Sequence, residues 1–257
     1  MKPTNEQISI IDRVEKTTEN IMVNALAGSG KTTTLDFIQS ASPKQPVMCL
    51  AFNRRIAEEM KKKFPDTTTV KTMNGLGHGI WYKAVGKITL NSKKMQEIFK
   101  EHVQTLPKEE ARQCWEVYWE VIVACGLAKS LGYVPEGKFP NAKRLIEKDL
   151  FHALLETKPA PLTIELIDHL LFLSIKTSYN GWIDFNDQVY MPALFGGTFP
   201  RFPLVLVDEA QDLNPVNHAI LTKLIKERAC FVGDRWQSIY AFRGAVTNGM
   251  QDLQGKF

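Results

Sequence analysis

The chain has 257 residues, 44% of them hydrophobic, and a formal net charge of +4. This length allows one large domain or two modest ones, and no apolar run reaches the roughly eighteen residues that would predict a membrane span. The mild basic balance permits a polyanionic partner without requiring one. The first residues, MKPTNEQISIIDR, are polar and mixed in charge, which argues against a secretory signal.

The cysteines and histidines show no metal-binding pattern. The four cysteines, Cys49, Cys114, Cys125 and Cys230, are scattered and form no CxxC pair. Cys49 and Cys230 fall inside apolar runs, as ordinary core thiols do. These features predict a reduced, cytoplasmic protein without a membrane segment.

Short apolar runs predict buried parallel strands in chain order. They are Ile21–Asn24, Val47–Ala51, Thr69–Thr72, Leu204–Val207 and Cys230–Val232. Between the early runs lie helical patterns, such as NRRIAEEMKKKF, in which Ile56, Met60 and Phe64 recur every fourth residue. This alternation predicts an α/β fold with a parallel sheet.

The middle of the chain has long helical patterns and few strand signals. We therefore predict an α/β domain formed by residues 1–84 and 181–257, with residues 85–180 as a helical insertion, partly a subdomain and partly packed on the α/β domain. Within it, CWEVYWEVIV places Trp115, Tyr118, Trp119 and Ile122 at helical spacing. This face is predicted to be core, and a base-stacking platform is the alternative.

A glycine-containing loop follows the first predicted strand. The segment ALAGSGKT fits the phosphate-loop pattern except that Ala25 replaces its first glycine. Gly28 and Gly30 would let backbone N–H groups surround a β-phosphate, at the positive end of the next helix. Lys31 would reach the β- and γ-phosphates, and the Thr32 hydroxyl would bind Mg²⁺. The predicted nucleotide-binding residues of this segment are Ala27, Gly28, Ser29, Gly30, Lys31, Thr32 and Thr33.

An acidic pair ends the predicted strand Leu204–Val207. Asp208 at this position can hold Mg²⁺ through water, and Glu209 can take a proton from an attacking water. A solvated acidic turn is the alternative for an isolated Asp-Glu pair, but the apolar strand and the phosphate loop favour the catalytic interpretation. The pair favours hydrolysis over phosphoryl transfer to a small acceptor.

Together these motifs resemble the UvrD/Rep-like family of superfamily 1 DNA helicases. Gln7 in TNEQ resembles the family's adenine-reading glutamine, and ALAGSGKT resembles motif I. The segment AFNRRIAEEM resembles motif Ia. The segment TMNGLG resembles motif Ib, with Asn74 in place of the usual histidine. The segment IDFNDQVYMPAL resembles the aspartate-phenylalanine segment before motif II, and VDEAQDLNP resembles motif II itself. The segment VGDRWQSIYAFRGA resembles motif III, with an unusual Trp236. The amino-acid sequence of these motifs is especially similar to that of F-box DNA helicases and phage relatives.

The resemblance implies a RecA-like P-loop ATPase domain that uses ATP and Mg²⁺, with Lys31, Asp208, Glu209 and Gln237 as catalytic residues. Gln237 would sense the γ-phosphate. Single-stranded DNA would contact Phe52, Arg54, Arg55, Thr72, Asn74, Tyr240, Phe242 and Arg243. A charged helix start is the alternative for Arg54 and Arg55, and core packing is the alternative for Phe242.

The expected function is that of the N-terminal half of an ATP-dependent DNA helicase, acting in repair or replication. Only VTNGMQDLQGKF follows motif III, so the second RecA-like domain is expected to be absent. That domain normally supplies an arginine worth roughly 10³–10⁵ in rate, so slow hydrolysis without duplex unwinding is expected of this chain. The alternatives are a regulatory module that binds nucleotide or DNA without turnover, and a split motor completed by a second polypeptide.

Overall fold

The computed structural model describes residues 2–26, 28–42, 45–155, 159–237 and 249–257. The chain divides into two compact units, one formed by Met1–Leu76 and Phe199–Phe257 and the other by Gly77–Thr198. The inserted unit is longer at both ends than the predicted segment 85–180. The added ends pack on each other, since a Cβ built on Gly77 would lie 2.1 Å from the Gln188 carbonyl oxygen.

The first unit contains a five-stranded sheet in the order β1-β7-β6-β2-β3, in which every strand pair is parallel. The strands are β1 (Ile21–Asn24), β2 (Val47–Ala51), β3 (Thr68–Thr72), β6 (Phe202–Val207) and β7 (Ile225–Gly233). Each predicted strand is confirmed, and β3, β6 and β7 begin earlier than their predicted runs. The early residues of β7 are partly exposed and charged, so the apolar run marked only its buried end.

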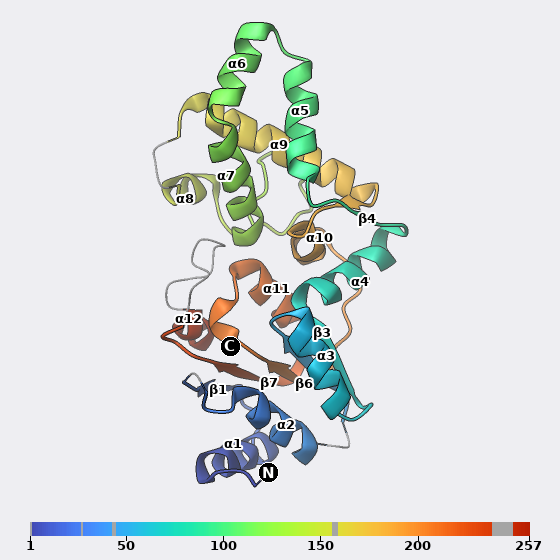
Figure 1. Ribbon diagram of the computed structural model, residues 1–257, viewed down its shortest axis with the longest axis vertical. Helices are drawn as coiled ribbons and strands as arrows, with labels where there is room; N and C mark the ends of the chain where they lie inside the picture. The colour runs from blue at the N-terminus through green and yellow to red at the C-terminus, as the bar shows by residue number, and fades with distance from the viewer. Residues whose placement is uncertain (1, 27, 43–44, 156–158, 238–248) are drawn as a thin grey trace. The chain divides into compact units, whose positions relative to one another are not determined.

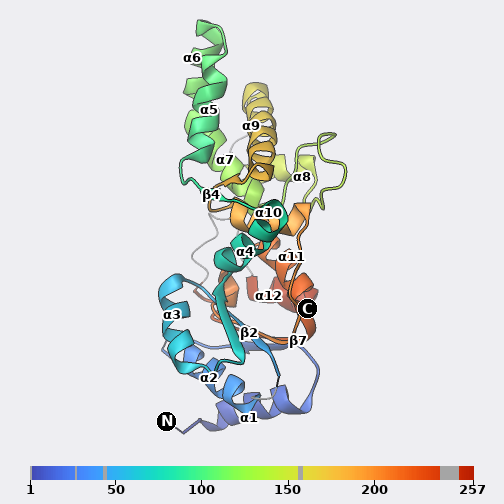
Figure 2. The same cartoon turned by 90° about the vertical axis from the view of Figure 1, so that its right-hand side faces the viewer.

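Helices cover both faces of this sheet (Figures 1 and 2). On one face a common core joins the sheet to α1 (Asn5–Lys16), α2 (Lys31–Ala41) and α3 (Arg54–Lys63). The opposite face carries α11 (Pro215–Leu224) and α12 (Gly249–Lys256), where the Phe231 and Phe257 rings lie 5.2 Å apart. The first unit is therefore a three-layer α/β domain, as predicted.

The inserted unit is mainly helical. Its elements are the greater part of α4 (Met73–Val85), α5 (Lys94–Gln104), α6 (Lys108–Glu116), α7 (Tyr118–Leu131), α8 (Lys148–Ala153), α9 (Pro161–Tyr179), α10 (Asp187–Phe195) and the short parallel pair β4 (Thr89–Leu90) and β5 (Trp182–Ile183). A core of apolar side chains from α5, α7 and α9 holds this unit together.

The prediction that the tryptophan-rich segment is simply core was wrong. Trp119 is 70% exposed and Trp115 is 46% exposed. The reason is that α6 ends at Glu116 and α7 begins at Tyr118, so a single helical period does not run through the segment. Tyr118 and Ile122 are partly buried against the core.

Candidate nucleotide and DNA site

The parallel sheet gathers the sequence motifs at one edge. The phosphate loop follows β1, motif II follows β6 and motif III follows β7, and these three strands are neighbours. Motifs Ia and Ib follow β2 and β3, whose last residues, Ala51 and Thr72, are paired in register. Because parallel strands end at the same edge, the motifs predicted to bind nucleotide lie on one side of this edge and those predicted to bind DNA on the other.

The phosphate loop owes its shape to two glycines. Gly28 and Gly30 have φ angles of 75° and 83°, in the left-handed region that favours glycine. Gly30 is the N-cap of α2, which places Lys31, Thr32 and Thr33 in its first turn. The N-terminal N–H groups of α2 therefore face a position suited to an anion. Ala27, the remaining predicted residue of this loop, lies outside the described residues.

Lys31 forms an ion pair with Glu209, with 2.7 Å between Nζ and Oε2. Both side chains are mostly buried. Glu209 is the one non-glycine residue of the described chain with a positive φ, which is 49°. This conformation is unfavourable for any residue that has a side chain. The geometry joins the phosphate loop directly to motif II.

Asp208 is a buried carboxylate with an unsatisfied oxygen. It is 5% exposed, and its Oδ1 has no hydrogen-bond partner in the described part of the chain. Burial first, and then the charge of Glu209, raise the pKa of Asp208 to about 6, with partial opposition from the Glu209 backbone N–H and from Lys31. A buried oxygen that lacks a donor fits a divalent cation, which prefers carboxylate ligands. The donor set therefore suits Mg²⁺, with Thr32 as the second predicted ligand.

Gln7 lies beside the phosphate loop. Its Nε2 donates to Thr34 Oγ1 at 3.0 Å, and a Cβ built on Gly30 would lie 3.7 Å from the same nitrogen. Its Oε1 accepts from the Thr4 N–H in a capping box. The structure thus places Gln7 next to the candidate nucleotide site.

Motif III begins with a hydrogen-bonded turn after β7. The Asp234 carboxylate accepts from the Trp236 N–H at 3.0 Å, and the Asp234 carbonyl accepts from the Gln237 N–H at 3.0 Å. Gln237 is partly exposed at the end of this turn. The predicted DNA residues Tyr240, Phe242 and Arg243 lie outside the described residues.

The sequence reasoning missed Gln211. Its Nε2 donates to Glu209 Oε2 at 2.8 Å, and its Oε1 accepts from the Asp234 N–H at 3.0 Å. The glutamine stands between the acidic residues of VDEAQD, so its position in motif II was the available signal. It connects motif II to motif III.

The predicted DNA residues of motifs Ia and Ib lie side by side in the first unit. Phe52, Arg54 and Arg55 are exposed after β2. Arg54 and Arg55 form exposed ion pairs with Glu58 and Glu59 on α3. After β3, Thr72 Oγ1 accepts from the Gly75 N–H, and Asn74 is partly exposed.

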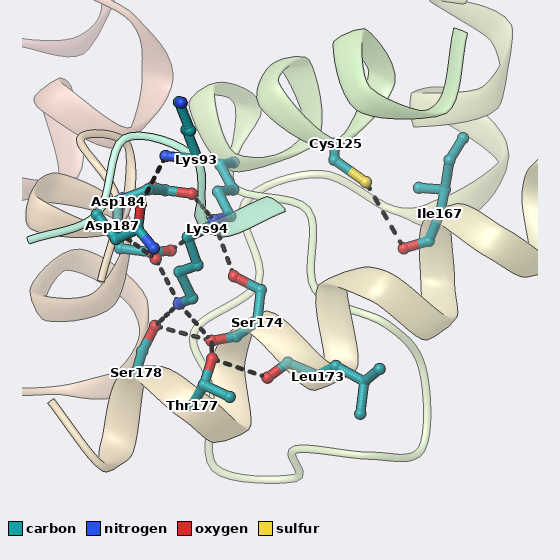
Figure 3. Close-up of polar contacts among 12 residues, drawn as sticks. Lys93, Lys94, Cys125, Ile167, Leu173, Ser174, Thr177, Ser178, Asp184 and Asp187 are labelled. Atoms are coloured by element: carbon teal, nitrogen blue, oxygen red, sulfur yellow. Dashed lines mark hydrogen bonds and ion pairs between the residues drawn. The ribbon is translucent and has the colours of Figure 1, made fainter. Parts of the chain in front are cut away.

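The inserted unit contains a separate buried charge cluster, formed by Lys94, Lys129, Asp184 and Asp187. Figure 3 labels Lys94 and the two aspartates. The Lys94 ammonium contacts Asp187, the Ser178 hydroxyl and the Ser174 carbonyl at 2.7–2.8 Å. The Lys129 ammonium contacts Asp184, Asp187 and the Ser174 hydroxyl at 2.6–2.9 Å. Each ammonium thus has three oxygen partners, as many as its donors.

Two negative findings apply to the described residues alone. No grouping of three or more histidine, cysteine, aspartate or glutamate side chains in the described ranges could hold a metal ion. None of the helices in these ranges is long and apolar enough to cross a membrane.

The sheet order, the phosphate loop and the strand-end acidic pair define a P-loop α/β domain. The UvrD/REP helicase N-terminal domain family matches residues 5–257. The chain belongs to this family, and its parallel sheet flanked by helices is the RecA-like fold of such helicase domains.

Curated relatives extend the similarity over most of the chain. F-box DNA helicase protein 1 of Schizosaccharomyces pombe is 25% identical over 94% of this chain and 28% of its own length. DNA helicase IV of Escherichia coli is 26% identical over 88% of this chain and 39% of its own length. The putative ATP-dependent DNA helicase YjcD of Bacillus subtilis is 25% identical over 95% of this chain and 34% of its own length. The chain therefore spans well under half the length of these relatives.

Proposed function

We propose that this chain is the N-terminal ATP-binding part of an ATP-dependent DNA helicase, which binds and hydrolyses Mg-ATP and contacts single-stranded DNA. The observation that carries the proposal is the buried, unsatisfied Asp208 oxygen beside the Lys31–Glu209 pair at the end of the phosphate loop. A buried carboxylate oxygen without a donor is costly unless a ligand completes it. The names of the curated relatives support ATP and DNA as ligands.

In the proposed site, the α2 N-terminus and Lys31 hold the triphosphate. Thr32 and Asp208 hold Mg²⁺, which supplies charge neutralisation of the phosphate oxygens. A bound phosphate competes with Glu209 for the Lys31 ammonium. Glu209 is then free of this ion pair and accepts the proton of the attacking water.

The proposed contact with DNA rests on the residues that follow β2 and β3 at the edge of the sheet. Phe52 supplies an exposed aromatic face, and aromatic side chains stack on bases of any sequence. The ion pairs of Arg54 and Arg55 are exposed helix pairs, which contribute only about 0.3–0.5 kcal/mol each. Both guanidinium groups can therefore exchange these partners for phosphates at little cost.

The test is ATP hydrolysis by the purified chain with Mg²⁺, with and without single-stranded DNA, beside a Glu209→Gln variant. We expect slow turnover that DNA stimulates and that the variant abolishes. Turnover that is equal in wild type and variant would contradict the assignment of Glu209. ATP binding without turnover would favour a regulatory module, and turnover restored by an added polypeptide would favour a split motor.

A further inference from the structure

Gln211 occupies a buried position between two motifs of the candidate site. Its side chain is 3% exposed, and it lies in the short helix η1 (Ala210–Asp212) directly after Glu209. Both ends of its amide are used, since Nε2 donates to the Glu209 carboxylate and, at 3.4 Å, to Asp212 Oδ2, while Oε1 accepts from the Asp234 N–H. A single side chain therefore fixes an atom of motif II against the backbone of motif III.

The contact on Glu209 falls on the same oxygen that pairs with Lys31. Glu209 Oε2 lies 2.7 Å from Lys31 Nζ and 2.8 Å from Gln211 Nε2. When a phosphate takes the Lys31 ammonium, the Gln211 bond is the one of these two that remains on the carboxylate. The Gln211 contact therefore still holds the Glu209 carboxylate when Lys31 no longer does.

The contact on Asp234 reaches the turn that carries Gln237. Every N–H from Asp234 to Gln237 has a partner: Gln211 for Asp234, Asn24 Oδ1 for Arg235, and Asp234 itself for Trp236 and Gln237. These four hydrogen bonds tie the turn to Gln211, to Asn24 and to its own Asp234. A displacement of this turn would therefore act on Gln211 and, through it, on Glu209.

Space around Gln211 is limited on the side of β7. A Cβ built on Gly233 would lie 2.6 Å from Gln211 Oε1 and 2.9 Å from the Met250 sulfur. A glycine at this point lets the glutamine amide lie against the strand end. Gly233→Ala is thus an independent way to displace the amide without changing Gln211 itself.

We infer that Gln211 is a positioning residue for hydrolysis, which aims the Glu209 carboxylate and ties it to the Gln237 turn, so that the base and the γ-phosphate sensor move together. This inference rests on the proposed ATPase function. It gives Gln211 no contact with nucleotide, so the nucleotide affinity does not depend on it.

The experiment compares kcat and the dissociation constant for Mg-ATP in wild type, Gln211→Met, Gln211→Glu and Gly233→Ala. Gln211→Met removes both hydrogen bonds at similar size, and Gln211→Glu keeps the acceptor for Asp234 but loses the donor to Glu209. We expect kcat to fall roughly ten- to a hundredfold in both Gln211 variants, as for the loss of a hydrogen bond to a charged group. Gly233→Ala should lower kcat in the same direction, and the dissociation constant should stay within about threefold of wild type throughout.

Wild-type kcat in Gln211→Glu would show a structural role only and would overturn the inference. A weaker affinity with unchanged kcat would also overturn it, since that pattern belongs to a nucleotide contact. If wild type and Glu209→Gln both lack turnover, the proposed function fails and the inference fails with it. If wild-type turnover depends on Glu209 but both Gln211 variants match wild type, the inference alone fails.

Discussion

The two units each contain lysine and aspartate or glutamate side chains in close contact, but the two groups differ in how completely they are satisfied. In the inserted unit, Lys94 and Lys129 each have three oxygen partners and are fully buried. In the first unit, Asp208 keeps an unsatisfied oxygen beside the mostly buried Lys31–Glu209 pair. Asp187 Oδ1 has no hydrogen bond among the described residues, but it lies 2.7 Å from the Lys129 ammonium, so its charge is matched inside the cluster. A cluster that matches its own charges does not need a ligand, whereas the Asp208 oxygen is suited to bind one.

The same difference appears in the pKa values. Burial alone would raise the pKa of Asp187, but the charges of Lys129 and Lys94 and their hydrogen bonds outweigh it and lower the pKa to about 2. For Asp208, burial and the Glu209 charge prevail and raise the pKa to about 6. The cluster in the inserted unit supplies its own counter-charges. In the candidate nucleotide site, a bound cation would supply the counter-charge of Asp208.

The largest expected effect comes from opening the complete cluster. Lys129→Met leaves Asp184 and Asp187 without one buried cation, and such a loss costs about 3–5 kcal/mol of unfolding free energy. Hydrogen exchange should show reduced protection of α7 and α9 amides, with α2 amides unchanged. Lys100→Met, on an exposed lysine of α5, is the control and should keep wild-type protection. Equal protection in both variants would mean that the cluster does not stabilise the inserted unit.

The next effect comes from removing the lysine of the incomplete group. Lys31→Met should leave the fold intact, because Glu209 is partly exposed and retains its Gln211 bond. The dissociation constant for Mg-ATP should rise about ten- to a hundredfold, as for the loss of a hydrogen bond to a charged group of about 1.5–3 kcal/mol. Equilibrium binding of a fluorescent ATP analogue measures this. An unchanged affinity with a lowered thermal midpoint would reverse the functional and structural roles given to the two lysines.

Acid should act on the complete cluster over a defined range. Because the pKa of Asp187 is lowered to about 2 from its ordinary value of 3.8, its contribution to stability is present above pH 4 and is lost as the pH falls toward 2. The contribution of this one group is roughly 2 kcal/mol. Urea unfolding followed through α9 should show this loss in wild type, and Asp187→Asn should show a smaller dependence on pH. Identical pH dependence in both would contradict the lowered pKa.

The smallest expected effect concerns an exposed ion pair. Arg112 contacts Glu109 at 2.6 Å on α6, and both side chains are about two-thirds exposed. Arg112→Ala should leave the unfolding free energy nearly unchanged, because solvent screens such exposed pairs. A loss of unfolding free energy as large as that of Lys129→Met would show that distance, and not burial, determines how much these ion pairs stabilise the fold.

The sequence was sufficient for the sheet and for the loop that follows its first strand. Apolar runs located β1 and β2 to the residue. The glycines of ALAGSGKT predicted a loop with inward-facing N–H groups before α2, and the structure adds that Gly28 and Gly30 are in the left-handed region. The exposure of Trp119 was not predictable from spacing, because spacing alone does not reveal that α6 ends at Glu116 and α7 begins at Tyr118. The functional assignments of the site residues stay predictions.

The complete cluster and Gln211 could not be found in the same way. Lys94 and Lys129 belong to different helices, and their aspartates come from a third region, so only the folded chain brings these charges together. Lysines are usually exposed, so a buried pair has no local sequence signature. Gln211 was visible within motif II, but its contact with Asp234 depends on the adjacency of β6 and β7.

The affinity of Glu209→Gln for Mg-ATP tests the central claim most directly, because this claim is that the incomplete group opens to receive a ligand. Glutamine keeps the size of Glu209 but removes the charge that pairs with Lys31. The account predicts that the variant binds Mg-ATP more tightly than wild type while its turnover is lost, because the nucleotide no longer competes with a carboxylate for the lysine. Weaker binding by the variant, or turnover equal to wild type, would contradict the account.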